Sequence, residues 1–204
     1  LDDTPAEQLE GEQSIYGKGM WAASLRYHKD TFYVCFASYD TGKTYIYRTK
    51  NINEPWEKRS LDGVYHHPSL LFDEDGRIYM GYGFNEVRIL ELNDTLTAPK
   101  EGGFERLLVE EKQDAYISYE GAHFYKKDGT YYIFVIQWLK GNLTQREQLC
   151  LYGDSLDGEF KKEMVFSENL GFPMKGVAQG GIVDTPEGDW YCIRNMGQLE
   201  KCRC

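Results

Sequence analysis

The sequence predicts an all-β propeller. Three observations support this fold class: a strand–turn–strand pattern that repeats along the chain, an aromatic fraction of 15% with 21 glycines, and no stretch with the 3.6-residue apolar period of a helix over three turns. Aromatic side chains suit the pleated surface of a sheet, and glycines suit the turns between strands. A chain of 204 residues is also long enough to bury a core.

Each repeat opens with a predicted hairpin. Four segments share an apolar run, a charged turn and a second, aromatic run: residues 26–34, 70–79, 123–132 and 182–191. In the last three, Asp-Gly or Glu-Gly stands in the turn, and these dipeptides favour tight hairpins. About 50 residues separate consecutive turns, which is the period of a propeller blade.

A second strand pair completes the repeat. Segments 44–48 and 148–152 are strand-like and lead on to segments 55–58 and 157–160, with the separating turns predicted at 53–56 and 156–159. Four strands per repeat are typical of a propeller blade. The alternative is a β-sandwich, in which shorter and less regular repeats are expected.

Composition excludes some partners. The net charge is −10, so the chain would repel a phosphate backbone, and we expect no nucleic-acid partner. No apolar run approaches 18 residues and no apolar leader stands at the start, so we expect no membrane partner and a cytoplasmic location.

The five cysteines predict no metal site. Cys35, Cys150 and Cys192 lie in apolar, aromatic runs and are expected to be buried thiols. Cys202 and Cys204 lie in a polar tail, with a spacing too tight for a zinc knuckle.

Four motifs stand in order along the chain: Gly19-Met20-Trp21-Ala22-Ala23-Ser24, the stretch from Tyr65-His66-His67-Pro68-Ser69 to Gly76-Arg77, Tyr119-Glu120-Gly121-Ala122-His123, and Gln179-Gly180-Gly181 with its neighbours. Together they resemble the motifs of glycoside hydrolase family 43, the β-xylosidase and α-L-arabinofuranosidase group. The resemblance covers about residues 12–195. It implies a five-bladed propeller, of which this chain would supply about four blades as a single domain over residues 1–204. Residues 1–14 would be a polar lead-in, and residues 196–204 a tail that does not match.

The resemblance also implies inverting hydrolysis by three carboxylates. Glu120 matches the general acid, which must give a proton to the leaving oxygen and therefore needs a raised pKa. His67 stands where the family has an Asp that tunes this acid. A neutral His lacks the negative charge of that Asp, and a protonated one would lower the pKa of Glu120.

The general base is expected before Trp21, but no Pro-Asp-Pro motif precedes that residue, so we expect most of the first blade to be missing. Asp40, Asp114, Asp184 or a partner chain are the alternative sources of a base.

Three further residues are candidates for sugar binding. Trp21 is either a wall of the sugar site, as the resemblance implies, or a core residue between blades. Gln179 stands beside two glycines and is expected to face the site, whereas His123 could face the site or fill the blade core. We expect no metal at His66–His67, because neighbouring strand residues face opposite sides. We expect no cofactor, with calcium as the alternative, since the hairpin turn already explains the acidic segment 73–75.

Two functions remain open from the sequence. The first is a glycosidase acting on xylan- or arabinan-derived oligosaccharides, with a pentose-containing oligosaccharide as its partner. The second is a catalytically impaired or inactive sugar-binding propeller, because the base is absent and His67 replaces the tuning Asp. A propeller that lacks a blade exposes strand edges, so we also expect a homo-oligomer.

Overall fold

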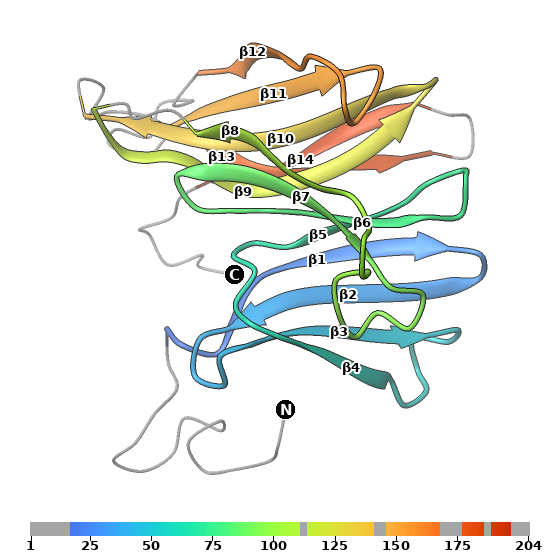
Figure 1. The fold of residues 1–204 in the computed structure, drawn as a ribbon. Helices are drawn as coiled ribbons and strands as arrows, with labels where there is room; N and C mark the ends of the chain where they lie inside the picture. The colour runs from blue at the N-terminus through green and yellow to red at the C-terminus, as the bar shows by residue number, and fades with distance from the viewer. Residues whose placement is uncertain (1–16, 111–113, 141–145, 168–176, 186–188, 197–204) are drawn as a thin grey trace, which may run out of the picture. The chain divides into compact units, whose positions relative to one another are not determined.

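The computed structural model describes residues 17–110, 114–140, 146–167, 177–185 and 189–196, and within these ranges strands are the only regular secondary structure (Figure 1). The strands form four antiparallel sheets. The all-β prediction is therefore confirmed, and a two-sheet sandwich does not fit. The described residues include no helix that could cross a membrane.

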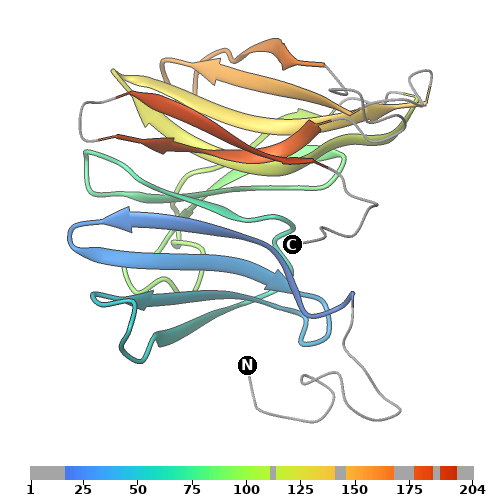
Figure 2. The same cartoon turned by 180° about the vertical axis from the view of Figure 1, so that it is seen from behind.

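Three sheets have four strands each, in chain order. The first holds β1 (Met20–His28), β2 (Thr31–Ser38), β3 (Lys43–Thr49) and β4 (Glu57–Asp62). The second holds β5 (Ser69–Phe72), β6 (Ile78–Tyr82), β7 (Glu86–Leu92) and β8 (Glu105–Glu110). The third holds β9 (Ala115–Lys127), β10 (Thr130–Leu139), β11 (Glu147–Gly153) and β12 (Lys161–Phe166). The fourth holds β13 (Val177–Asp184) and β14 (Trp190–Met196), which are clearest from behind (Figure 2).

The predicted hairpins are present. Lys29 and Asp30 join β1 to β2 with φ of 47° and 56°, and Asp128 and Gly129 join β9 to β10 with φ of 51° and 82°. Two left-handed residues in succession are the mark of the type I′ turn that suits twisted hairpins. The predicted turn at 156–159 is present around residues 156 and 157, and the strand after it, β12, begins at Lys161.

Contacts divide the chain into two compact units. The first unit comprises residues 1–82 and 89–106, and the second comprises residues 83–88 and 107–204. In the first unit, apolar side chains from the first sheet pack with others from β5 to β7 and the loop after β7: Cys35, Ile46, Leu61, Leu70, Met80, Leu90, Leu92 and Leu96. In the second unit, β13 packs against β9, β10 and β11. The prediction of a single domain stays a prediction.

Two of the three cysteines expected in the core are there. Cys35 and Cys150 are buried, and burial raises the pKa of both thiols, that of Cys150 to about 12. The prediction for Cys192 is wrong, because this residue is exposed on β14. An aromatic run does not distinguish the two faces of a strand, so it does not show whether Cys192 faces a core or solvent. Cys202 and Cys204, with the predicted lead-in and the rest of the tail from residue 197, lie outside the described residues.

Candidate active site

Trp21 lies at a bulge in β1. Trp21 pairs with Ala37 and Ser24 pairs with Cys35, so β1 has one more residue than β2 between these two pairs. Ala22 absorbs the bend with a left-handed φ of 40°. A bulge redirects the side chains around it, which is why bulges are frequent beside active sites. The indole is half-buried, and its Nε1 donates a hydrogen bond to the carbonyl of Gly17 over 3.0 Å.

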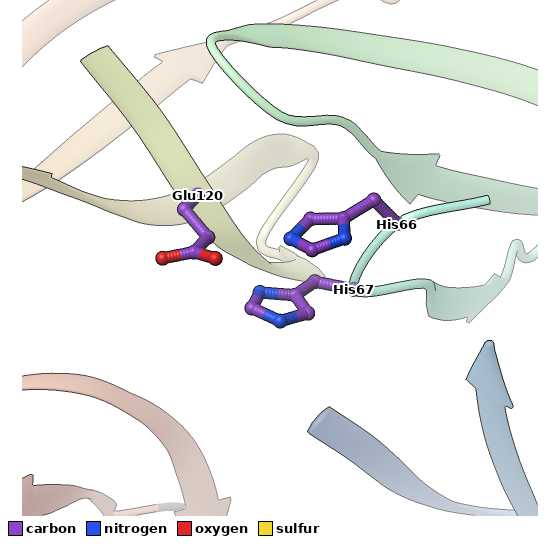
Figure 3. Close-up of side chains that lie close together, drawn as sticks. All are labelled: His66, His67 and Glu120. Carbon is purple, nitrogen blue, oxygen red and sulfur yellow. The ribbon is translucent and has the colours of Figure 1, made fainter. Parts of the chain in front are cut away.

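His66 and His67 lie in a bend before β5, and their rings stack on each other (Figure 3). The ring centroids are 3.9 Å apart and the planes meet at 20°. The prediction that the two rings face opposite sides is wrong, because the pair is not in a strand and His67 has a left-handed φ of 49°.

The first unit brings Trp21 and His67 together. Their rings are 6.2 Å apart and nearly parallel, at 26°, and His67 is only 4% exposed. Hydrogen bonds from β1 hold the start of β5 in place: Ser24 Oγ donates to the carbonyl of Pro68 over 2.8 Å, and Arg26 donates to the Leu70 carbonyl over 2.9 Å. This cross-strand connection fixes the Trp21–His67 arrangement.

Sequence reasoning missed two members of this aromatic cluster. The Tyr39 ring packs edge-on against Trp21 at 5.7 Å, and its hydroxyl shares a hydrogen bond with Nδ1 of His66. His66 also lies 6.1 Å from the Trp21 ring. The position of His66 next to His67 was a usable signal. Tyr39, the residue after β2, carried none.

Glu120 lies between two bulges of β9 in the second unit. On β10, Phe134, Ile136 and Trp138 are two residues apart, yet they pair with His123, Glu120 and Ile117, which are three apart. The Glu120 carboxylate is half-buried and projects from the strand (Figure 3). Gly121 follows with a φ of 71°, which an L-residue adopts only with strain.

Two glycines, Gly121 on β9 and Gly181 on β13, lie where these strands approach each other closely, beside Gln179 and His123. A Cβ on Gly121 would lie 2.8 Å from Cγ of Gln179, and one on Gly181 would lie 3.5 Å from Nδ1 of His123. Tyr125 seals the same contact, because its hydroxyl accepts the N–H of Ile182 over 2.7 Å. The glycines thus let two strands approach closely enough to place Gln179 directly over the residue that follows Glu120.

The alternative bases are surface groups where their side chains are described. Asp40 is exposed and bonded to the hydroxyl of Ser38. The Asp114 side chain is 83% exposed and pairs with Lys140 at 2.7 Å. The side chain of Asp184 lies outside the described residues. Neither Asp40 nor Asp114 has a setting that marks a catalytic base.

The acidic segment 73–75 does not fit a calcium loop. Asp73 Oδ1 accepts the backbone N–H of Glu74 over 2.6 Å, and the Asp75 carboxylate accepts hydrogen bonds from Arg77. These carboxylates close the hairpin between β5 and β6, as expected from the turn sequence.

Comparisons with known proteins show which proteins this chain resembles in sequence and structure. The chain is similar to the bifunctional GH43-CE protein of Bacteroides eggerthii, with 36% identity and a TM-score of 0.82 over 95% of this chain and 25% of that one. It is 25% identical to the beta-xylosidase of Formosa agariphila over 90% of this chain and 34% of that protein. It is also 25% identical to the xylosidase/arabinosidase of Butyrivibrio fibrisolvens over 100% of this chain and 42% of that protein.

The chain thus spans about a third to two fifths of the length of these curated relatives. Its strand repeats and four sheets agree with the propeller-type fold that the motifs imply. The family model of glycosyl hydrolases family 43 matches residues 1–201. On this evidence the chain belongs to glycosyl hydrolases family 43.

Proposed function

We propose that this protein hydrolyses glycosidic bonds in xylan- or arabinan-derived oligosaccharides, with Glu120 as the general acid. One observation carries the proposal: the family's acid motif lies on β9, where two bulges and Gly121 hold Glu120 half-buried. A carboxyl group that is partly withdrawn from water keeps its proton more readily than an exposed one, and a general acid needs that proton.

The proposed reaction inverts the anomeric centre. Glu120 gives its proton to the glycosidic oxygen as the bond from that oxygen to the anomeric carbon breaks. A water molecule attacks the same carbon from the opposite face and loses its proton to a carboxylate base. Trp21 offers an aromatic face on which the apolar side of a sugar ring can stack. Gln179 and His123 are the proposed polar contacts to sugar hydroxyls.

A second candidate function is sugar binding without efficient hydrolysis. It is favoured by His67, which is 4% exposed and stands at the family position of the acid-tuning Asp. A buried imidazole has no negative charge with which to favour the protonated form of an acid. A chain with this substitution would keep the aromatic face of Trp21 and lose rate rather than affinity.

The test is hydrolysis of an aryl β-xyloside and an aryl α-L-arabinofuranoside by the 204-residue chain and by Glu120→Gln. We expect turnover of one of these substrates that Glu120→Gln reduces by about 10²- to 10⁴-fold. Turnover that survives Glu120→Gln contradicts the role of Glu120. If neither protein turns over, xylo- and arabino-oligosaccharide binding, with Trp21→Ala as the comparison, decides for or against the second candidate.

A further inference from the structure

Asn85 makes two hydrogen bonds to the residues immediately before Glu120. Its Oδ1 accepts the backbone N–H of Ser118 over 2.9 Å, and its own N–H donates to the carbonyl of Tyr119 over 2.8 Å. Asn85 belongs to the second unit, like the strand that it contacts, although it stands in the loop between β6 and β7. The two bonds form a clamp on β9 at the site of a bulge.

The bulge explains why a clamp is needed there. Between Ile117 and Glu120, β9 advances three residues while β10 advances two. The extra residue of a bulge is left out of the regular ladder, so its backbone groups need partners from elsewhere. Ser118 and Tyr119 are 7% and 0% exposed, so water is a poor substitute. Asn85 supplies an acceptor to Ser118 and a donor to Tyr119.

The loop is shaped for this contact. Asn85 has a left-handed φ of 58°, a conformation that Asn tolerates better than most residues. Gly83 has a φ of 144°, and a Cβ there would lie 2.1 Å from the carbonyl oxygen of Glu86. Two unusual backbone conformations in three residues thus turn Asn85 toward β9.

Tyr119 is also held from its side chain. The Lys162 ammonium on β12 donates to the Tyr119 hydroxyl over 3.3 Å. The residue before Glu120 is therefore fixed at its carbonyl by Asn85 and at its hydroxyl by Lys162. A shift of Tyr119 along the strand would break both bonds.

We propose that Asn85 is a positioning residue for Glu120: it closes the bulge at Ser118–Tyr119 and so sets the direction of the Glu120 carboxyl. The proposal rests on the proposed function in one respect, namely that Glu120 is the acid whose direction matters. The catalytic consequence follows because a reacting group displaced by about 1 Å can lose about a hundredfold in rate.

Two variants and a control test the side-chain hydrogen bond of the clamp. Asn85→Gly keeps the left-handed backbone and removes the Oδ1 acceptor. Asn85→Asp keeps an acceptor oxygen at the same place and should rescue the clamp. Asn93→Gly is the matched control, because Asn93 Oδ1 accepts a backbone N–H in the same way, from Thr97 within its own turn of the first unit.

Two readouts on the labelled full chain need no activity: hydrogen exchange at the Ser118 amide and the NMR titration of the Glu120 carboxyl carbon. In Asn85→Gly we expect exchange at Ser118 to rise by about fivefold, the loss of one hydrogen bond, and the Glu120 titration midpoint to move. Asn93→Gly should match the wild type in both readouts, and Asn85→Asp should restore the slow exchange at Ser118, although its added negative charge raises the Glu120 midpoint. An unchanged Glu120 titration in Asn85→Gly, or an equal change in Asn93→Gly, overturns the proposal.

Kinetics on the aryl pentosides add a third readout. We expect Asn85→Gly to lower kcat by about 10- to 100-fold, to leave KM within about twofold, and to move the alkaline limb of the pH–rate profile. A rise in KM alone would contradict a positioning role. If the wild type shows no turnover that depends on Glu120, the proposed function fails, and the exchange and titration data still decide whether Asn85 sets the Glu120 environment.

Discussion

The first and third sheets each have a β-bulge in their first strand, but the two bulges differ in how they are packed. In both, the first strand carries a bulge directly at a predicted site residue, Trp21 on β1 and Glu120 on β9. In both, the next residue has a left-handed φ, 40° at Ala22 and 71° at Gly121. The chemistry of that residue differs. β1 tolerates a strained alanine, whereas β9 has a glycine with Gln179 packed on it.

The difference reflects what lies above each bulge. On β1 the side chain that follows Trp21 has room for a methyl group, so only backbone strain opposes it. On β9 there is no such room, because a Cβ on Gly121 would overlap Gln179. The bulge of β9 is therefore constrained from three directions, by Gln179, by Asn85 and by Lys162, which is the arrangement expected where a reacting group must be held precisely.

The largest expected effect concerns the chemistry on each strand. If β9 carries the acid and β1 the sugar-binding surface, Glu120→Gln should lower kcat by about 10²- to 10⁴-fold. Trp21→Ala should instead raise KM by about tenfold with a smaller change in kcat, because it removes stacking that is present before the reaction. Steady-state kinetics on the better aryl pentoside measure the split.

Tyr27→Ala is the control, since Tyr27 is a 61% exposed aromatic residue on the same strand as Trp21. A Trp21→Ala variant that unfolds more easily and keeps its KM would assign Trp21 to the core instead.

The next largest effect is on the stability of the β9 bulge. Gly121→Ala should cost about 2–4 kcal/mol in unfolding free energy, the sum of a left-handed L-residue and an overpacked contact. Urea denaturation measures this cost. In a Gln179→Ala background, the part of this cost that comes from overlap with Gln179 should disappear, and the part that comes from the left-handed backbone should remain. Equal costs in both backgrounds would show that Gln179 yields to the new methyl group.

Ion pairs provide a second contrast between the units. In the first unit the Glu91 side chain is 5% exposed, 2.6 Å from the Lys100 ammonium and 3.1 Å from the N–H of Phe104. Burial by itself would raise the pKa of Glu91, but the hydrogen bonds from Lys100 and Phe104 outweigh it and hold the pKa below its usual value. Glu91→Gln should cost about 1–3 kcal/mol at pH 7.

The pH dependence of that cost follows from the direction of the shift. A lowered folded-state pKa gives stability that is present above the unfolded value, about 4.3, and is lost as the pH falls through the folded value. The difference between the wild type and Glu91→Gln should therefore shrink below about pH 4. The control is Asp114→Asn, which breaks the exposed pair with Lys140 and should have a smaller effect at every pH. Equal losses in the two variants would mean that burial does not distinguish the pairs.

The smallest expected effect is at the β1 bulge. Ala22→Gly should stabilise the protein by about 0.5 kcal/mol, because relief of the left-handed strain slightly exceeds the added entropy of the unfolded chain. Thermal unfolding in parallel with Gly121→Ala gives the direct comparison of the two bulges. A clear loss of stability in Ala22→Gly would show that the alanine methyl group makes a packing contribution that outweighs its strain.

Much of the fold was predictable because it is encoded locally. Alternating apolar residues and turn dipeptides such as Asp128-Gly129 predicted the hairpins, and three of the four sheets have the predicted four strands. Errors arose where the face of a residue was at stake. Cys192 looked buried and is exposed, and the rings of His66 and His67 were expected to diverge and instead stack. Neither face is set by local sequence, because His66 and His67 lie in a bend rather than a strand and the exposure of Cys192 on β14 depends on how the sheets pack.

The candidate site also contains residues that the sequence indicated and residues that it did not. Motif resemblance indicated Trp21, His67, Glu120, His123 and Gln179, residue by residue, because side-chain chemistry is written in the sequence. It did not indicate Tyr39 or Asn85, whose contacts depend on where their loops lie.

The sequence by itself determined the family, the all-β class, the hairpins and the identity of the candidate acid, because these depend on composition, period and short motifs. Only the tertiary structure decided that β9 bulges on both sides of Glu120, that Gln179 lies over Gly121, and that Asn85 closes the gap in the ladder. The physical reason is that a bulge, a close approach and a borrowed hydrogen bond each join residues far apart in the chain. Their existence depends on which backbone groups the packed strands leave without a partner in the ladder.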